Sequence, residues 1–129
     1  MKSFPITRET PARFSSPPPR EADVVVIGGG VAGVMTAWFL ARSGVKVVLC
    51  EKGRIAGEQS GRNWGWIRKQ GRDPSELPIM IEALEIWRKL EAEAEADLGF
   101  RETGVLYLGN GPADMEQYDA WMHHARAHG

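Results

Sequence analysis

The sequence predicts an α/β fold with a parallel sheet, and two apolar runs separated by glycines carry this prediction. Residues 24–41 read VVVIGGGVAGVMTAWFLA and contain no charged residue between Asp23 and Arg42. About 18 apolar residues could span a membrane as a helix. Three consecutive glycines argue against a span, because each weakens a continuous helix by about 1 kcal/mol relative to alanine. We therefore expect a strand, a tight turn and a helix.

The two halves of this stretch differ in side-chain shape. Residues 24–27 are β-branched and apolar, which favours a strand of a parallel sheet that is covered on both faces. Residues 35–41 favour a helix, and Gly44 supplies a stop. A second apolar run at 45–49 predicts a second strand, and a strand-helix-strand unit places its strands parallel.

Composition excludes several classes of protein. At 129 residues, with 43% hydrophobic content and a net charge of −1, the chain is long enough for one modest globular unit. Its 16 Lys and Arg residues against 17 Asp and Glu residues leave no basic excess for nucleic acid. Cys50 is the only cysteine, so there is no internal disulfide, and we expect a small apolar residue at the end of a buried strand. We expect a cytoplasmic location and no transmembrane segment.

Residues 1–21 are expected to form a flexible, proline-rich arm. They lack the apolar core of a secretory signal, and the prolines at 17–19 favour an extended conformation that cannot join a helix. The folded part, a partial dinucleotide-binding domain, is then expected to cover residues 22–129.

The second half of the chain alternates between irregular and regular patterns. Residues 53–78 contain five glycines and many polar residues, which predicts a long loop. Apolar residues at spacings of three and four over 79–98 predict an amphipathic helix that ends at Gly99, with the acidic run 91–97 on its solvated face.

The alternation over residues 100–109 predicts a further strand. Val105 and Tyr107 would lie on one face, and the leucines that follow each of them would lie on the other. A turn comes next, and Pro112 is expected to begin a last helix.

The glycine motif carries the chemistry. Gly28, Gly30 and Gly33 satisfy G-x-G-x-x-G between the first strand and the helix, and Glu51 ends the second strand. Gly28 permits the sharp turn, Gly30 lets the backbone approach a pyrophosphate, and Gly33 lets the helix pack closely on the strand. This context predicts a dinucleotide site rather than a simple connecting turn.

Each part of the motif has a partner on the nucleotide. The N–H groups at the helix start, those of Val31 and Ala32 included, would face the phosphates. Glu51, with Lys52 beside it, would accept hydrogen bonds from the adenosine ribose, and its charge would repel a 2′-phosphate and so disfavour NADP. A Walker-type loop is excluded because no Gly-Lys-Ser/Thr follows. The motif leaves FAD and NAD open.

The loop after Glu51 narrows this choice. The stretch SGRNWG offers Ser60, Arg62 and Asn63, which suit contacts with a pyrophosphate and a flavin ring. Together with DVVVIGGGVAGVMTAWFLARSGVKVVLCEKG and TGVLYLG, it resembles the N-terminal part of the D-amino-acid oxidase/glycine oxidase-like family of FAD-dependent oxidoreductases, which includes D-amino-acid dehydrogenases. The resemblance covers about residues 22 to 110.

The resemblance implies a Rossmann-like FAD-binding domain that oxidises an amine or amino acid by hydride transfer to the flavin. The residues that it implies along FAD are Gly28, Gly30, Gly33, Glu51, Ser60, Arg62 and Asn63. Because members of the family are several times longer, we expect an incomplete domain, with the first strand of a substrate domain at 100–109. The catalytic residues cannot be named from this sequence. Other subunits are a further possibility that the resemblance implies. The alternatives are a non-catalytic nucleotide-binding module or truncated subunit, and a fragment of an NAD-dependent dehydrogenase.

Two further features carry weaker signals. His124 and His128 could share a helix face, but no H-E-x-x-H pattern or further ligand accompanies them, so we expect surface histidines and no metal. Trp64 and Trp66 could either stack on the flavin or anchor the loop, and the sequence favours neither.

Overall fold

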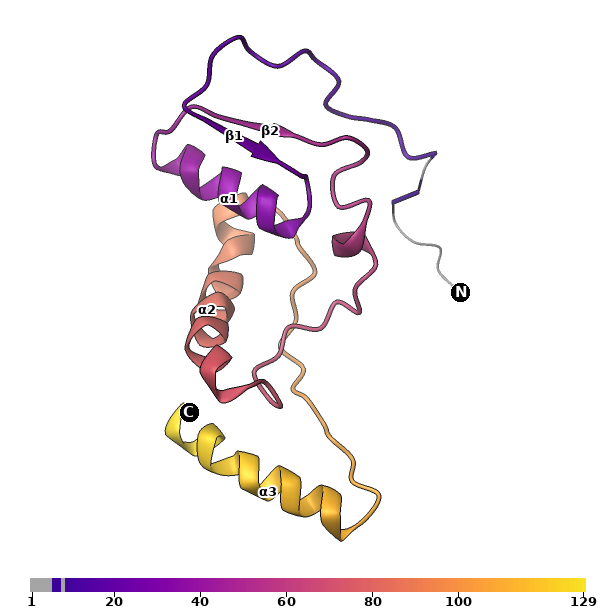
Figure 1. The fold of residues 1–129 in the computed structure, drawn as a ribbon, viewed down its shortest axis with the longest axis vertical. Coiled ribbons are helices and arrows are strands. Elements are labelled where there is room, and N and C mark those ends of the chain that lie inside the picture. The colour runs from indigo at the N-terminus through magenta and orange to yellow at the C-terminus, as the bar shows by residue number, and fades with distance from the viewer. Residues whose placement is uncertain (1–5, 8) are drawn as a thin grey trace. The chain divides into compact units, whose positions relative to one another are not determined.

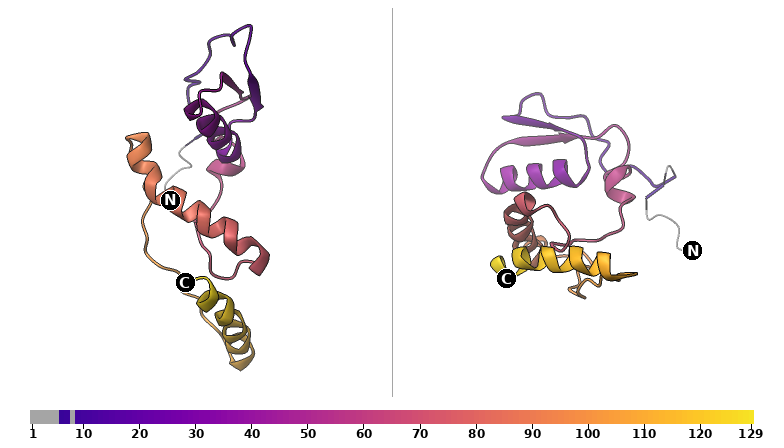
Figure 2. Two further views of the ribbon diagram at one scale, coloured as in Figure 1. Left: turned by 90° about the vertical axis from the view of Figure 1, so that its left-hand side faces the viewer. Right: turned by 60° about the horizontal axis from the view of Figure 1, so that its bottom comes forward.

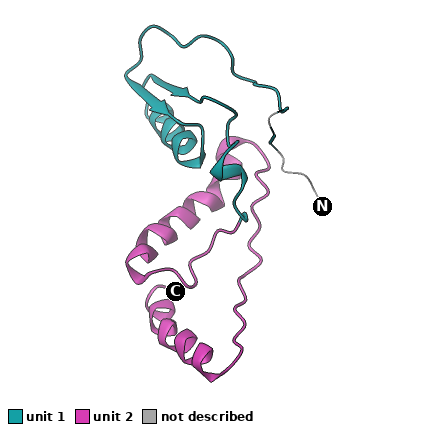
Figure 3. Ribbon diagram, turned by 45° about the vertical axis from the view of Figure 1, so that its right-hand side comes forward, with its two compact units in different colours: residues 1–65 teal, residues 66–129 magenta. Residues whose placement is uncertain are grey.

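The structure, a computed structural model, describes residues 6, 7 and 9–129. The chain divides into two compact units, residues 1–65 and 66–129, which are described separately (Figure 1 and Figure 3).

The first unit contains the predicted strand-helix-strand arrangement. Strand β1 (Val24–Ile27) leads into helix α1 (Val31–Arg42), which returns the chain to strand β2 (Val47–Cys50). The two strands pair in parallel, with Val24 opposite Val47. Helix α1 lies along one face of this pair (Figure 1 and Figure 2). The α/β class and the parallel sheet are thus confirmed.

The expectation that the strands are covered on both faces is wrong. Along β1 every second side chain faces outward, with Val25 58% and Ile27 88% exposed. Cys50 is exposed as well, rather than buried at the end of its strand. The reason is that within the first unit α1 covers one face of the sheet, while the described residues of that unit form no second helix or strand layer on the other.

The chain passes from β1 into α1 through a glycine turn, residues 28–30. Gly28 has φ +109°, which L side chains rarely adopt, and its N–H donates to the Cys50 carbonyl at 2.8 Å. A Cβ built on Gly33 would lie 1.9 Å from the Gly28 carbonyl oxygen. The predicted close approach between the first turn of the helix and the end of the strand is therefore present.

The predicted loop 53–78 contains two short 3₁₀ helices, η1 (Gln59–Gly61) and η2 (Pro74–Glu76). The side chain of Asp73 accepts the N–H of Ser75 at 2.9 Å and thereby caps η2. Local capping thus orders parts of a segment that its composition marks as irregular.

In the second unit, helix α2 (Leu77–Ala94) is the predicted amphipathic helix. It ends earlier than expected, because Glu95 adopts φ +50° and the next N–H, of Ala96, donates to the Glu91 carbonyl at 3.2 Å. The Glu91 carboxylate accepts the N–H of Leu98 at 2.9 Å and so holds the chain beyond the helix end. Glu91 is therefore a structural acceptor and not simply part of a solvated face, and Gly99 is not the stop.

The apolar face of α2 largely matches the prediction. Leu77 and Leu90, 2% and 6% exposed, are the buried hydrophobic residues of the described chain. Trp87 stacks on Phe100 with the ring centroids 6.0 Å apart. Of the predicted apolar residues, Ile79 is 67% exposed and Leu98, beyond the end of α2, is 44% exposed, so neither joins the core.

The predicted strand at 100–109 is not formed. The alternation of faces is present, since Val105 and Tyr107 are half-buried while Leu106 and Leu108 are 81% and 77% exposed. A strand also needs a neighbour to complete its ladder of hydrogen bonds, and no other described segment pairs with this one. The segment is instead held by side chains, such as the Tyr107 hydroxyl, which donates to the Gln70 carbonyl at 3.2 Å.

Helix α3 (Pro112–Ala127) begins at the predicted proline. Its Trp121 indole N–H donates to the Arg72 carbonyl at 3.0 Å, which ties the helix to the rest of the second unit. Within the described residues, no helix combines the length and the apolar character that a membrane crossing requires.

Part of the predicted arm lies outside the described residues, namely residues 1–5 and 8. The part from residue 9 to residue 21 contains neither helix nor strand. It is not wholly detached, because the Arg54 guanidinium donates through Nε to the carbonyl of Thr10.

We expect Gly33→Ala to destabilise the protein by about 1–3 kcal/mol, because the added methyl would meet backbone atoms that cannot move without shifting α1 from β1. Thermal or urea unfolding followed by circular dichroism measures this loss. Gly111→Ala is the control, since a Cβ there meets open space. Because Gly111 is the N-cap of α3 and Ala is less favourable there, it should cost about 0.5–1 kcal/mol. Equal stability of the two variants would show that the contact between Gly28 and Gly33 is not required.

Candidate functional site

A hollow of about 160 Å³ lies where the glycine turn meets the segment that follows β2. It is thus at the carboxyl ends of both strands, the edge at which open parallel sheets bind their ligands. Its lining residues are Gly29, Gly30, Glu51, Arg54, Ala56, Gly57, Glu58, Gln59 and Ser60. This volume is smaller than the roughly 300–1,000 Å³ of typical ligand pockets, so it can enclose only part of a dinucleotide.

The start of α1 offers hydrogen-bond donors next to this hollow, and Gly30 among them lines it. The first four N–H groups of a helix have no acceptor within the helix itself. Here the Ser60 hydroxyl accepts the N–H of Val31 at 2.8 Å. For the N–H groups of Gly30, Ala32 and Gly33, the described residues provide no acceptor. Three donors at the positive end of a helix dipole can therefore serve an anion.

The small size of the glycines is what lets the two segments meet. A Cβ on Gly30 would lie 3.1 Å from the Ser60 hydroxyl, and one on Gly29 would lie 2.5 Å from the Ile55 Cδ1. The backbone at both positions is therefore closely covered from one side. An anion can approach the amides of this turn only because no side chain projects from it, which fits the diphosphate of a dinucleotide.

Glu51 is held by backbone amides on both carboxylate oxygens. Its Oε2 accepts the N–H of Gly29 and its Oε1 accepts the N–H of Gly53, both at 2.7 Å. These bonds, that of Gly29 foremost, lower the pKa of the Glu51 carboxyl from its ordinary value. Each carboxylate oxygen still has a lone pair with which to accept a hydroxyl of a ribose.

The predicted loop residues differ in their relation to the hollow. Ser60 reaches it and caps α1, whereas Lys52, Arg62 and Asn63 are outside its lining. Arg62 pairs with Glu58 at 3.0 Å and is largely exposed. Asn63 donates to the Ser60 carbonyl, so it supports the loop that carries Ser60.

Sequence reasoning missed residues that shape the site through the backbone. Ala56 adopts φ +57° and its N–H donates to the Gly29 carbonyl at 2.8 Å, which fastens the loop to the glycine turn. A Cβ on Gly57 would lie 2.9 Å from the Arg54 carbonyl oxygen, so this position also requires a small residue. The adjacent small residues Ala56 and Gly57 were the available signal.

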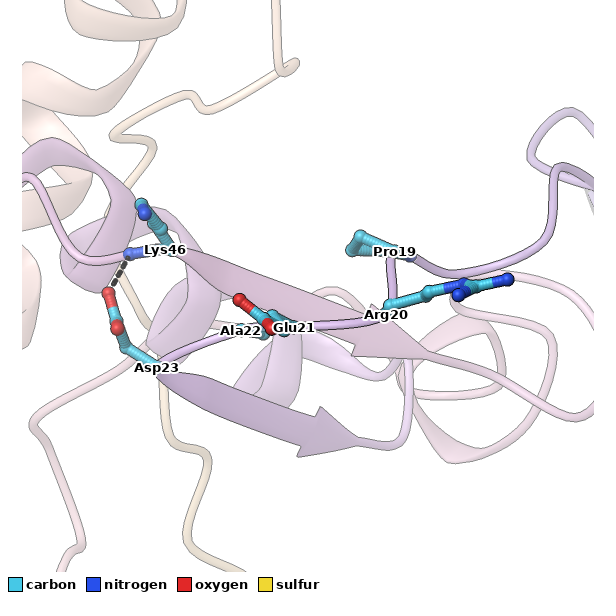
Figure 4. Close-up of a pocket in the computed structure, with 6 residues that line it drawn as sticks. All are labelled: Pro19, Arg20, Glu21, Ala22, Asp23 and Lys46. Atoms are coloured by element: carbon cyan, nitrogen blue, oxygen red, sulfur yellow. Dashed lines mark hydrogen bonds between the residues drawn. The ribbon is translucent and has the colours of Figure 1, made fainter.

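A larger hollow, of about 470 Å³, lies at the amino ends of the strands (Figure 4). It is lined by residues 19–23 and by Lys46, whose N–H donates to the Asp23 carboxylate at 2.9 Å. Most of these side chains are exposed, and none of the lining residues belongs to the glycine motif or to the segment after β2. Its size therefore does not make it the candidate site.

The tryptophans after Asn63 have different environments. Trp64 is 91% exposed, so it does not anchor the loop. Trp66 is 45% exposed, with the Arg68 guanidinium 5.0 Å from its ring centroid. Within the described residues, no group of three or more His, Cys, Asp or Glu residues could hold a metal ion.

Comparison with known proteins places this geometry in a family. The model of the family described as DAO, FAD dependent oxidoreductase, matches residues 23–129. The sarcosine oxidase subunit beta of an Arthrobacter species is 34% identical over 107 residues, which cover 81% of this chain and 26% of that protein. Human mitochondrial dimethylglycine dehydrogenase is 29% identical over 78% of this chain and 12% of its own length.

Solved structures agree with this result. The L-amino acid deaminase from Proteus myxofaciens has a TM-score of 0.81 and 34% sequence identity, over 85% of this chain and 25% of that one. The chain spans about a quarter or less of these relatives. Since the family model matches most of its length, the chain belongs to the DAO family of FAD dependent oxidoreductases.

Proposed function

We propose that this chain forms the FAD-binding part of an oxidoreductase that oxidises an amine or an amino acid by hydride transfer to the flavin. The observation that carries the proposal is the start of α1 at the carboxyl ends of a parallel sheet. There the N–H groups of Gly30, Ala32 and Gly33 have no acceptor among the described residues, and Gly30 lines a hollow. A cofactor with two linked phosphates supplies the acceptors that this site lacks.

The residues of the site fit FAD in distinct roles. The amides of Gly30, Ala32 and Gly33 would hold the diphosphate, and Glu51 would accept the ribose hydroxyls with an orientation already fixed by Gly29 and Gly53. Bound FAD supplies the acceptor for the hydride that leaves the carbon bearing the amine. The share of this chain is to bind and orient the cofactor so that its reactive end meets that carbon.

The substrate class follows from the names of the relatives. These act on sarcosine, dimethylglycine or L-amino acids, so an amine or amino acid is the class that we propose here. One relative is named as a subunit, which supports a further proposal that this chain works with other subunits. A cytoplasmic location stays a prediction from the sequence.

The family match does not favour the NAD-dependent alternative, because the family is one of FAD dependent enzymes. A non-catalytic nucleotide-binding role differs from the proposed function in one measurable respect, namely reduction of bound flavin by an amine.

The direct test is the visible absorption spectrum of the purified protein, before and after anaerobic addition of sarcosine, dimethylglycine or a panel of D- and L-amino acids. We expect flavin bands that bleach with at least one of these compounds. Flavin bands that none of them bleaches would support a non-catalytic module. Protein that is colourless and takes up no FAD would overturn the proposed function.

We expect Gly30→Asp to abolish FAD binding, because the added side chain would crowd the Ser60 hydroxyl, 3.1 Å from its Cβ, and its charge would repel the diphosphate. The dissociation constant, measured by quenching of flavin fluorescence, should rise on the order of 100-fold or more. Gly111→Asp introduces the same charge at an open position and should bind FAD as the wild type does. Retained affinity in Gly30→Asp would count directly against the site.

Glu51→Gln should weaken FAD binding roughly tenfold, because the amide has one acceptor oxygen where the carboxylate has two. The N–H groups of Gly29 and Gly53 favour ionised Glu51 in the folded protein, so its contribution to folding stability is complete above the ordinary pKa of 4.5 and is lost as the pH falls through the lowered value. The free energy of unfolding should therefore decline below about pH 4.5 in the wild type and change less in Glu51→Gln. Equal FAD affinity of the two proteins at pH 7 would remove Glu51 from the site.

A further inference from the structure

Arg54 lines the hollow between the glycine turn and the segment that follows β2, and it belongs neither to the glycine motif nor to the predicted loop residues. Its side chain is half-buried and lines the hollow together with Gly30 and Ser60. Its Nε donates to the Thr10 carbonyl, and its Nη1 donates to the Gly53 carbonyl at 3.3 Å. For its Nη2, the described residues offer no acceptor, so part of this guanidinium remains available to a ligand.

Arg54 is also the one cation among the lining residues of the hollow. The two acidic side chains of the same wall have other partners. Glu51 accepts backbone N–H groups, and Glu58 pairs with Arg62 at 3.0 Å. Arg54 forms no ion pair with either of them within the described chain, and its two protein acceptors are uncharged carbonyls, so its positive charge is not neutralised by a protein carboxylate.

We propose that Arg54 binds a phosphate of the dinucleotide in this hollow and that the Thr10 carbonyl holds its guanidinium in position. A guanidinium and a phosphate form charge-assisted hydrogen bonds of matching geometry. Gly30, whose N–H has no acceptor among the described residues, and Arg54 both line the hollow, so a phosphate there would receive donors from both. The proposal rests on FAD binding and adds a residue that the glycine motif does not contain.

The positioning role of Thr10 follows from the turn around it. The Thr7 N–H donates to the Thr10 hydroxyl at 2.9 Å, and the Thr10 N–H donates to the Thr7 carbonyl at 3.2 Å. This small turn directs the Thr10 carbonyl to the Nε of Arg54. The part of the N-terminal segment around Thr10 is therefore linked to the cofactor site and is not independent of it.

The test compares ADP with adenosine as competitors of bound FAD, in the wild type and in Arg54→Gln. ADP carries the phosphates and adenosine does not. We expect Arg54→Gln to weaken the binding of ADP and of FAD roughly tenfold and to leave the affinity for adenosine unchanged. The salt dependence of FAD binding should also become shallower, since one cationic contact is lost. Arg20→Gln removes the same charge from an exposed position and should change none of these values.

Removal of residues 2–10 tests the positioning role. We expect the truncation to weaken ADP binding several-fold when Arg54 is present. It should have no further effect on ADP binding in Arg54→Gln, because the Thr10 carbonyl acts through the Arg54 guanidinium. Additive losses would overturn the role of Thr10. Adenosine binding reports that each variant is folded.

The outcomes separate this proposal from the proposed function. Wild-type protein that binds neither FAD nor ADP would overturn both. If the wild-type protein binds FAD and Arg54→Gln binds ADP as tightly as the wild type does, the role of Arg54 alone is overturned. Equal weakening of ADP and adenosine in Arg54→Gln would show that Arg54 supports the fold of the site and does not bind phosphate.

Discussion

The close approach of Gly33 to the Gly28 carbonyl is the constraint on which the rest of the first unit depends. Because no side chain separates them, the first turn of α1 lies directly against the end of β1. The start of the helix is then held beside the carboxyl ends of β1 and β2, next to the hollow that Gly29 and Gly30 line. A bulkier residue at Gly33 would move the donors as well as the helix.

The segment after β2 completes the site by hydrogen bonds to the glycine turn. Glu51 accepts the N–H of Gly29, Ala56 donates to the carbonyl of the same glycine, and Ser60 accepts the N–H of Val31. Both backbone groups of Gly29 are thus used by a segment more than twenty residues further along the chain. The hollow is therefore shaped by the protein itself, and a ligand would meet acceptors and donors whose directions are already set.

The features predicted correctly from the sequence are those that neighbouring residues determine. The β-branched run before the glycines and the helix-forming run after them produce β1 and α1, and the spacing of apolar residues produces α2. Features that need a distant partner were not predictable in the same way. Residues 100–109 keep the alternation of a strand, but without a neighbouring strand they form no ladder.

The same distinction applies to the site. The glycines and Glu51 are visible in the sequence because a motif fixes their spacing, and the structure brings them together. Arg54 was not visible, since its relevance depends on a contact with Thr10 far away in the sequence. The end of α2 at Glu95 instead of Gly99 depends on the backbone conformation of one residue, which no residue-type preference indicates for glutamate.

The two-stranded sheet has a consequence for handling the chain. Within the described part of the chain, β1 and β2 are the strands of the sheet, so each has an outer edge without a strand partner that presents unpaired N–H and C=O groups. The outward side chains of Val25 and Ile27 add an apolar surface beside one of these edges. A pair of this kind is only marginally stable in water without further strands or packing. A segment that pairs with the outer edge of β1 or β2 would block the same edge from pairing with another copy of the chain. Whether this chain aggregates therefore depends on what pairs with β1 and β2.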